Sequence, residues 1–268
     1  MKIIINDFNI NFKLSTILIL LLMIALGYIG QFFILYMFVL FHEIIHILTA
    51  YCFGKKCRSI VIMPVGLCAE IDGIEDMRLY KRNIVIISAP LFNIIIGLLF
   101  NNTYFGLGNL LIGFFNLLPI YPLDGARLFQ NITGYYLGTL RANKWLMITG
   151  NIFIVILFVC GIIQLVLFDF NFSVIIIAMY VYKESKKINL NRAYYFYKCL
   201  IKNKKRTMNK IKFVRTDMNI SLKELLYRFG IDYYTIIYVN GKIIDEDIIK
   251  DFISKYGIGY KLMDILEH

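Results

Sequence analysis

Long runs of apolar residues dominate the first two thirds of the chain, and short polar segments separate them. The six runs cover residues 14–29, 32–53, 84–100, 107–120, 146–168 and 170–182. A helix needs about 20 mainly apolar residues to cross a bilayer, and all runs but the fourth and sixth approach that length. We therefore predict an α-helical polytopic membrane protein with about six transmembrane helices.

Basic residues fall on one side of this predicted arrangement. If the N-terminus is cytoplasmic, the external connections lie around Gly30, residues 101–106 and Asp169, and they contain no Lys or Arg. Every connection on the opposite side contains basic residues, as cytoplasmic connections of membrane proteins usually do. The charges thus predict a multi-pass protein of the cell membrane with both termini in the cytoplasm.

The pattern changes near residue 187. Eleven Lys and Arg residues and one acid lie between Lys183 and Lys212, where aromatic residues are mixed with lysines. We interpret residues 188–210 as a basic amphipathic linker on anionic lipids, with contact to a substrate as the alternative. Residues 1–187 then form the six-helix transmembrane domain, and residues 211–268 form a separate cytoplasmic domain.

Residues 211–268 have the pattern of a small α/β domain. Strands are predicted at 212–215, 234–239 and 242–244, and helices at 221–229 and 245–256. Asn240-Gly241 between the last two strands is typical of a tight hairpin turn. A domain of this size has a small core, so we expect it to dimerise or to dock on another surface.

Overall composition supports a membrane location. Of the 268 residues, 59% are hydrophobic and 18% are charged, whereas soluble chains are about half apolar and about a quarter charged. The net charge of +11 is concentrated in the basic segment, so we predict no nucleic-acid partner. The five cysteines form no C-x-x-C pair, which favours reduced structural thiols.

A His-Glu-x-x-His motif lies inside the second apolar run, at residues 42–46. Positions i and i+4 share one face of a helix, so His42 and His46 can bind the same ion. Neutral imidazole suits Zn²⁺, and Glu43 can act as general base toward a water at the metal. Ionisable residues inside a span are costly and usually functional, which disfavours a purely structural interpretation.

A catalytic zinc site normally has a third protein ligand. Asp124 is our candidate, in the segment Asn-Leu-Leu-Pro-Ile-Tyr-Pro-Leu-Asp-Gly at residues 116–125. Its two prolines interrupt the helix, and Gly125 permits a tight turn that can direct the carboxylate inward. The alternative is an ordinary Asp-Gly turn at the end of a span. The acids of the loop at residues 70–76 are expected to face water.

These motifs together resemble the site-2 protease family of intramembrane zinc metalloproteases. The similar segments lie at residues 42–46, 63–70, 88–93 and 116–125, and a module similar to a single CBS domain follows them. The resemblance implies that His42, His46 and Asp124 bind Zn²⁺ and that Glu43 activates water. It thus implies a zinc metalloendopeptidase.

The resemblance also assigns a catalytic role to Asn93 and Asn116, which would stabilise the substrate carbonyl or oxyanion. An amide donor in a dry site can meet developing negative charge in this way. For Asn93, helix–helix packing is an equal alternative. Residues 59–64 and 68–71 are expected to form short strands whose edge pairs with an extended substrate, or else a hairpin lying on the membrane.

Within that family, the chain also resembles the sporulation members. This closer resemblance implies pro-sigma-K as protein substrate, inhibitory membrane proteins as partners, and the mother-cell membrane around the forespore as location. Self-association and adenine nucleotide are implied for the C-terminal module. Two alternatives stay open: another membrane-associated substrate, and a non-catalytic metal-binding scaffold, which the intact Glu43 disfavours because a structural site needs no base.

Overall fold

The computed structural model describes residues 2–5, 8–12, 29–63, 66–167, 173–202, 211–230 and 233–267, with four single positions between 13 and 28. The first predicted span, at residues 14–29, therefore lies mostly outside the described residues. The chain divides into two compact units. The first comprises residues 1–119, 123–128 and 161–180, and the second comprises 120–122, 129–160 and 181–268.

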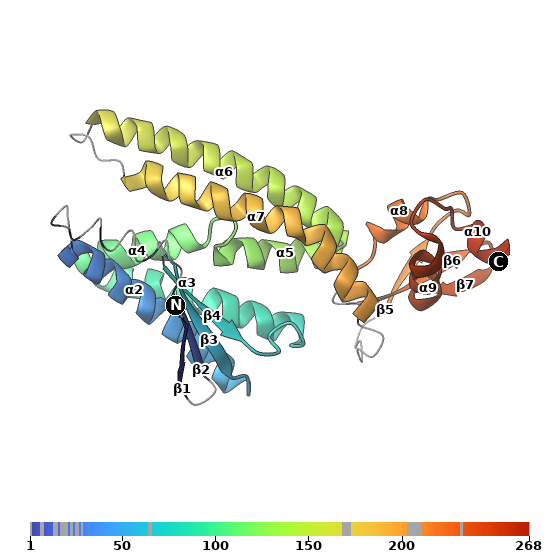
Figure 1. Ribbon diagram of the computed structural model, residues 1–268, viewed down its shortest axis with the longest axis horizontal. Coiled ribbons are helices and arrows are strands. Elements are labelled where there is room, and N and C mark those ends of the chain that lie inside the picture. Colours follow the sequence, from blue (N-terminus) through green and yellow to red (C-terminus); the bar gives the residue numbers. More distant parts are fainter. Residues whose placement is uncertain are drawn as a thin grey trace. The chain divides into compact units, whose positions relative to one another are not determined.

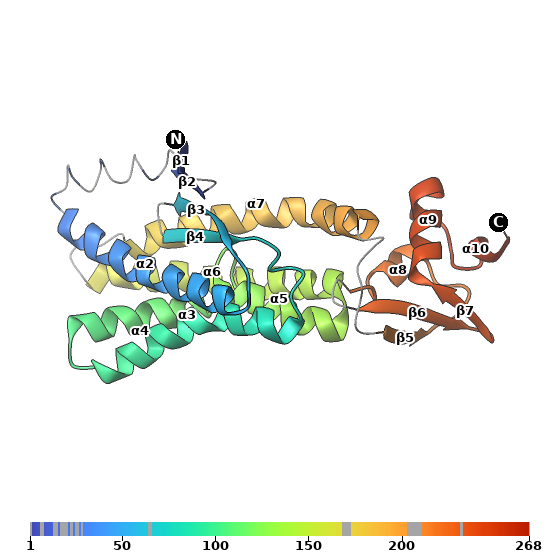
Figure 2. The same cartoon turned by 90° about the horizontal axis from the view of Figure 1, so that it is seen from below.

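Three helices form the centre of the first unit: α2 (Ile29–Cys52), α3 (Leu79–Leu99) and α4 (Tyr104–Asn116). Helices α3 and α4 run side by side, and α2 packs against α3 (Figure 2). Glycines allow the close approach of α3 and α4: a Cβ on Gly97 would lie 2.5 Å from Leu110, and one on Gly113 would lie 3.0 Å from the Pro90 carbonyl oxygen.

A four-stranded sheet in the same unit has the order β1-β2-β3-β4 (Figure 1). Its strands are β1 (Lys2–Ile5), β2 (Phe8–Phe12), β3 (Cys57–Met63) and β4 (Gly66–Ile71). Strands β3 and β4 pair antiparallel, while β2 runs parallel to β3. The two strands predicted between the second and third apolar runs are therefore confirmed, whereas β1 and β2 were not predicted.

Three further helices follow: α5 (Asp124–Leu137), α6 (Thr139–Leu167) and α7 (Ser173–Lys202). Among the described residues, α3 and α6 are long and apolar enough to cross a membrane. Much of the side-chain surface of α6 is apolar and exposed, for example at Val155, Val159 and Ile162, which suits contact with lipid. The structure thus supports a mainly helical membrane protein, and the number of six spans stays a prediction.

Helix α7 continues through the predicted boundary at residues 187 and 188. The segment 173–202 contains no Gly or Pro that would interrupt a helix, so the start of the predicted linker extends the preceding helix. Residues 203–210 of that linker lie outside the described part of the chain.

The C-terminal domain has the predicted α/β pattern. Its sheet has the order β5-β6-β7, with β5 parallel to β6 and β6 antiparallel to β7. The elements are β5 (Ile211–Arg215), α8 (Leu222–Leu226), β6 (Tyr234–Val239), β7 (Lys242–Asp245), α9 (Glu246–Tyr256) and α10 (Asp264–Glu267). Asn240 and Gly241 have φ values of 44° and 81°, as the predicted hairpin turn requires. The similarity of this domain to a CBS domain stays a prediction.

The domain core also includes a residue from the second unit's helices. The core contains Leu222, Phe229 and Ile249, and Leu140 of α6 packs against it. The Thr139 N–H donates to the Phe229 carbonyl oxygen at 3.1 Å. Within this unit the domain therefore docks on the α5–α6 turn, one of the two outcomes expected for so small a core.

Candidate metal centre

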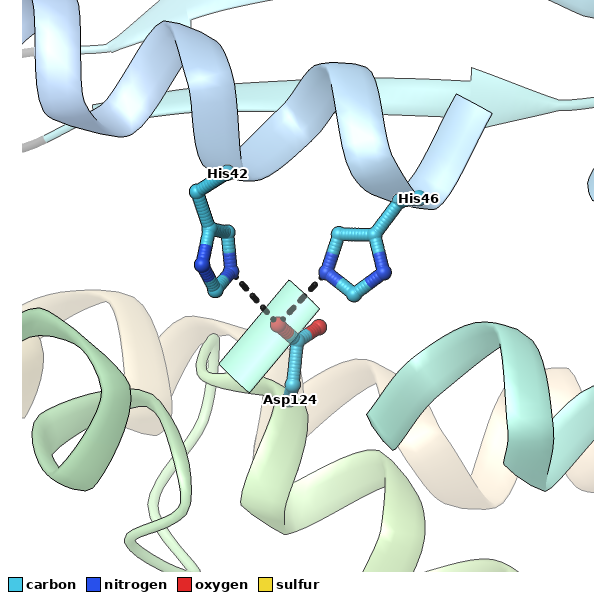
Figure 3. A group of neighbouring side chains, drawn as sticks. All are labelled: His42, His46 and Asp124. Carbon is cyan, nitrogen blue, oxygen red and sulfur yellow. Dashed lines mark hydrogen bonds and ion pairs between the residues drawn. The ribbon is translucent and has the colours of Figure 1, made fainter. Parts of the chain in front are cut away.

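Helix α2 carries the two histidines of the predicted motif on one face. No Gly or Pro interrupts it between residues 31 and 52, so His42 and His46 lie one helical turn apart. Their ring centroids are 5.0 Å apart, and the residues are only 2% and 7% exposed. Both rings point from α2 toward the same carboxylate, as Figure 3 shows.

That carboxylate belongs to Asp124, the first residue of α5. Its Oδ2 lies 3.2 Å from His42 Nε2 and 2.9 Å from His46 Nε2. The turn before α5 brings its backbone close to the preceding segment: a Cβ on Gly125 would lie 2.1 Å from the Leu117 carbonyl oxygen. Glycine at position 125 is therefore a steric requirement of the turn that directs Asp124 at the histidines.

The other imidazole nitrogens are held by acceptors. His46 Nδ1 lies 2.7 Å from the Val85 carbonyl oxygen, and His42 Nδ1 lies 3.2 Å from Asn93 Oδ1. A carbonyl oxygen only accepts, so His46 Nδ1 carries the proton and its Nε2 faces Asp124 as a donor atom for a metal. Zinc-binding histidines usually have such an acceptor behind them.

The residues present fit a zinc ion. Two imidazole nitrogens and one carboxylate oxygen from buried or largely buried side chains lie within 4.8 Å of one another. Three protein ligands of these types are the usual set of a catalytic zinc site, which keeps a further position for water or substrate. His42, His46 and Asp124, which the sequence suggested as ligands, are therefore brought together by the fold.

Glu43 lies next to His42 on the same helix and contacts the sheet. The backbone N–H of Ala69 on β4 donates to Glu43 Oε2 at 3.0 Å. Because Glu43 uses this N–H, it lies on the side of β4 that faces away from β3. Strand β4 is the edge of the sheet among the described strands. The side of β4 that pairs with no described strand therefore runs beside the residue expected to act as base.

The two predicted asparagines have different surroundings. Asn93 on α3 is 1% exposed, contacts His42 Nδ1 through Oδ1, and donates from Nδ2 to Asn109 Oδ1 on α4 at 3.2 Å. Asn116 donates to the Ile112 carbonyl oxygen of its own helix at 3.0 Å. Asn109 was not among the predicted site residues, because its only signal in the sequence is a polar residue within an apolar run.

The acids of the loop at residues 70–76 are exposed, as expected. Glu70 accepts a hydrogen bond from the Ser59 hydroxyl, and Asp72 lies 3.9 Å from Arg58. Neither joins the group formed by the two histidines and Asp124. These acids therefore do not compete with Asp124 as the third ligand among the described residues.

Comparison with known proteins agrees with this geometry. The family described as Peptidase family M50 matches residues 102–160, which include Asp124. A solved structure of the site-2 protease from Methanocaldococcus jannaschii has a TM-score of 0.55 at 25% identity, and the match covers 70% of this chain and 94% of that one. The chain is similar to the site-2 proteases. The resemblance predicted from the motifs is confirmed.

Two curated relatives are similar over part of their length. A zinc metalloprotease of Methanocaldococcus jannaschii is 27% identical over 195 residues, which cover 65% of this chain and 55% of that protein. Stage IV sporulation protein FB of Bacillus subtilis is 31% identical over 114 residues, which cover 38% of this chain and 40% of that protein. The chain thus spans about half the length of the curated proteins that it matches.

Proposed function

We propose that this chain is an intramembrane zinc metalloprotease that hydrolyses a peptide bond in or next to the membrane. The observation that carries the proposal is the group of His42, His46 and Asp124, whose ligand atoms lie within 4.8 Å of one another. Glu43 occupies the helical turn between the two histidines. Relatives named as a zinc metalloprotease and a site-2 protease support this choice of chemistry.

In this mechanism His42, His46 and Asp124 would hold the ion. Bound Zn²⁺ supplies Lewis acidity toward the peptide carbonyl and toward water. The Glu43 carboxylate takes a proton from the attacking water while the water oxygen forms a bond to the peptide carbonyl carbon. Glu43 then donates that proton to the leaving amine as the carbon–nitrogen bond breaks. One water is consumed, and one carboxyl and one amine terminus are produced.

The edge of β4 is the proposed substrate-binding element. A protease acts on an extended backbone, and an exposed sheet edge binds such a backbone by adding it as a further strand. The contact between Ala69 and Glu43 supports this assignment because it fixes the edge beside the base. A peptide paired with β4 would run past Glu43, and this pairing would orient the peptide carbonyl for attack.

The finer assignments also belong to the proposal. The likeness to a stage IV sporulation protein supports a sporulation role, with pro-sigma-K as substrate at the mother-cell membrane. Inhibitory membrane proteins, cytoplasmic termini, self-association and adenine nucleotide at the C-terminal domain accompany that role. A different membrane-associated substrate is the alternative within the same activity.

Co-expression of the full chain with candidate substrates tests the activity. The substrates are a pro-sigma-K fragment and a membrane-anchored anti-sigma fragment, and product size is followed on gels. The proposal predicts a shorter product with the wild type and with the surface control Asp72→Asn, and none with Glu43→Gln. A product with Glu43→Gln would contradict the assignment of the base. Zinc bound without cleavage of either substrate would favour the scaffold.

A further inference from the structure

We propose that Asn109 is a positioning residue of the metal centre, which acts through Asn93 to hold His42 in the tautomer that binds metal. The inference rests on the proposed zinc site and names two residues that prepare it. Asn109 lies on α4 and is 5% exposed, in an apolar surrounding where an amide is costly unless it is hydrogen-bonded.

Three hydrogen bonds connect α4 to the first ligand. Asn109 Nδ2 donates to the Phe105 carbonyl oxygen at 2.9 Å, and Asn93 Nδ2 donates to Asn109 Oδ1 at 3.2 Å. Asn93 Oδ1 then lies 3.2 Å from His42 Nδ1. The connection passes through three helices, and both amide groups are buried.

The Phe105 carbonyl oxygen, at one end of this series of hydrogen bonds, determines which group donates at each step. The Phe105 carbonyl oxygen can only accept, so Asn109 must present its NH₂ group to it and its oxygen to Asn93. Asn93 must then present its NH₂ group to Asn109 and its oxygen to His42. An oxygen facing His42 Nδ1 requires a proton on that nitrogen. The Nε2 lone pair of His42 is left for the ion.

The two histidines thus reach the same state by different routes. His46 Nδ1 donates directly to the Val85 carbonyl oxygen at 2.7 Å, whereas His42 reaches a backbone carbonyl only through two amides. Removal of Asn109 would free the Asn93 amide to rotate, so both tautomers of His42 would become populated. His46 would be unaffected, which makes it an internal control.

Helix packing does not require these amides. Glycines on either side of Asn109, at positions 106 and 113, already bring α4 against α3 and the end of that helix. A Cβ on Gly106 would lie 1.9 Å from the Phe100 carbonyl oxygen, and one on Gly113 would lie 3.0 Å from that of Pro90. The close approach is therefore a property of the glycines, and Asn109 has a separate role.

Histidine-labelled full-length protein tests the inference directly. The chain has three histidines, so imidazole ¹⁵N signals can be assigned with single substitutions. In metal-free Asn109→Leu, the His42 signals should change from the Nδ1–H tautomer toward a mixture while those of His46 stay constant. Asn143→Leu, which removes a buried asparagine of α6, should change neither. Unchanged His42 signals, or equal changes at both histidines, would overturn the inference.

Zinc affinity, measured by competition with a chelator in detergent, gives the second readout. Asn109→Leu and Asn93→Leu should each weaken zinc about 10- to 100-fold, as loss of an outer partner of a ligand does. The double variant should bind zinc no more weakly than Asn93→Leu alone, because both substitutions break the same series of hydrogen bonds. Lower thermal stability with wild-type zinc affinity would reduce Asn109 to a packing residue. Should Asn109→Leu fail to fold, Asn109→Ser, which is too short to reach Asn93, replaces it with the same expected loss.

These readouts do not depend on cleavage. A wild type that binds zinc and cleaves no peptide contradicts the proposed function. The His42 signals then still decide whether Asn109 acts through Asn93 on the His42 tautomer. If the wild type cleaves, and Asn109→Leu keeps the wild-type His42 tautomer and the wild-type zinc affinity, only the positioning role of Asn109 is contradicted.

Discussion

The backbone N–H of Ala69 donates a hydrogen bond to Glu43 Oε2 over 3.0 Å, joining the edge of a sheet to the acid of the histidine motif. This hydrogen bond fixes the position of Glu43 Oε2, so that Oε1 is the oxygen that can take a proton from water. It also occupies an edge group that a substrate strand would otherwise use. Peptide binding at β4 and proton transfer by Glu43 are therefore linked at a single backbone group.

Substitution of Ala69 by Pro tests this link. Proline has no N–H, so Glu43 would lose its partner without any change to the metal ligands. We expect cleavage to fall about 10- to 100-fold, corresponding to one hydrogen bond to a charged group, while zinc affinity stays at the wild-type value. Ala69→Ser keeps the N–H and should retain activity. Full activity in the proline variant would exclude a role for this bond.

The turn at Gly125 provides a second prediction. An alanine Cβ would lie 2.1 Å from the Leu117 carbonyl oxygen and 2.5 Å from that of Leu118, so the backbone must move and take Asp124 with it. We expect Gly125→Ala to weaken zinc binding by at least about tenfold, as measured by chelator competition, since a misplaced ligand is effectively lost.

Gly134→Ala on the same helix is the matched control. Its Cβ would meet nothing closer than 3.8 Å, and alanine has the higher helix propensity. This variant should keep wild-type zinc affinity and equal or exceed the wild type in thermal stability. Equal loss of zinc in both glycine variants would show that α5 as a whole, and not the turn, determines the position of Asp124.

Gly138 connects α5 to α6 with a φ of +91°. A Cβ added at this position would lie 2.4 Å from the Tyr227 carbonyl oxygen. Gly138→Ala is therefore both strained and crowded, and should loosen the C-terminal domain from this turn. We expect faster hydrogen exchange at the Thr139 amide, which donates to Phe229 in the wild type. Gly259→Ala, with nothing within 4 Å, should leave the exchange unchanged. Unaltered exchange in Gly138→Ala would contradict this docking contact.

Local patterns were sufficient for the elements whose signals lie in adjacent residues. The His42–His46 spacing placed both rings on one helix face, and Asn240-Gly241 marked the hairpin of the C-terminal domain. Strands β1 and β2 were missed although residues 8–12 alternate between apolar and polar and the two strands pair with each other. Strand β2 also pairs with β3, about fifty residues later in the chain. Such pairing leaves no trace in a local window.

Roles that depend on a partner were harder to predict. Asn93 was assigned two roles from the sequence, and its contact with His42 Nδ1 could be seen only once α2 and α3 were packed. Asn109 was not singled out, because one asparagine in an apolar helix has no periodic pattern and its partner lies 16 residues away. Asp124 was found because prolines and Gly125 mark its turn in the sequence itself.

The most direct test of the account combines zinc content with cleavage in one preparation of purified full-length protein. The wild type should carry zinc and cleave, Asp124→Asn should lose the metal, and Glu43→Gln should keep the metal and lose cleavage. The amide oxygen that Glu43→Gln introduces can still accept from the Ala69 N–H, so the fold around the site should be preserved. Cleavage by Glu43→Gln at the wild-type rate, or full zinc occupancy in Asp124→Asn, would contradict the central claim.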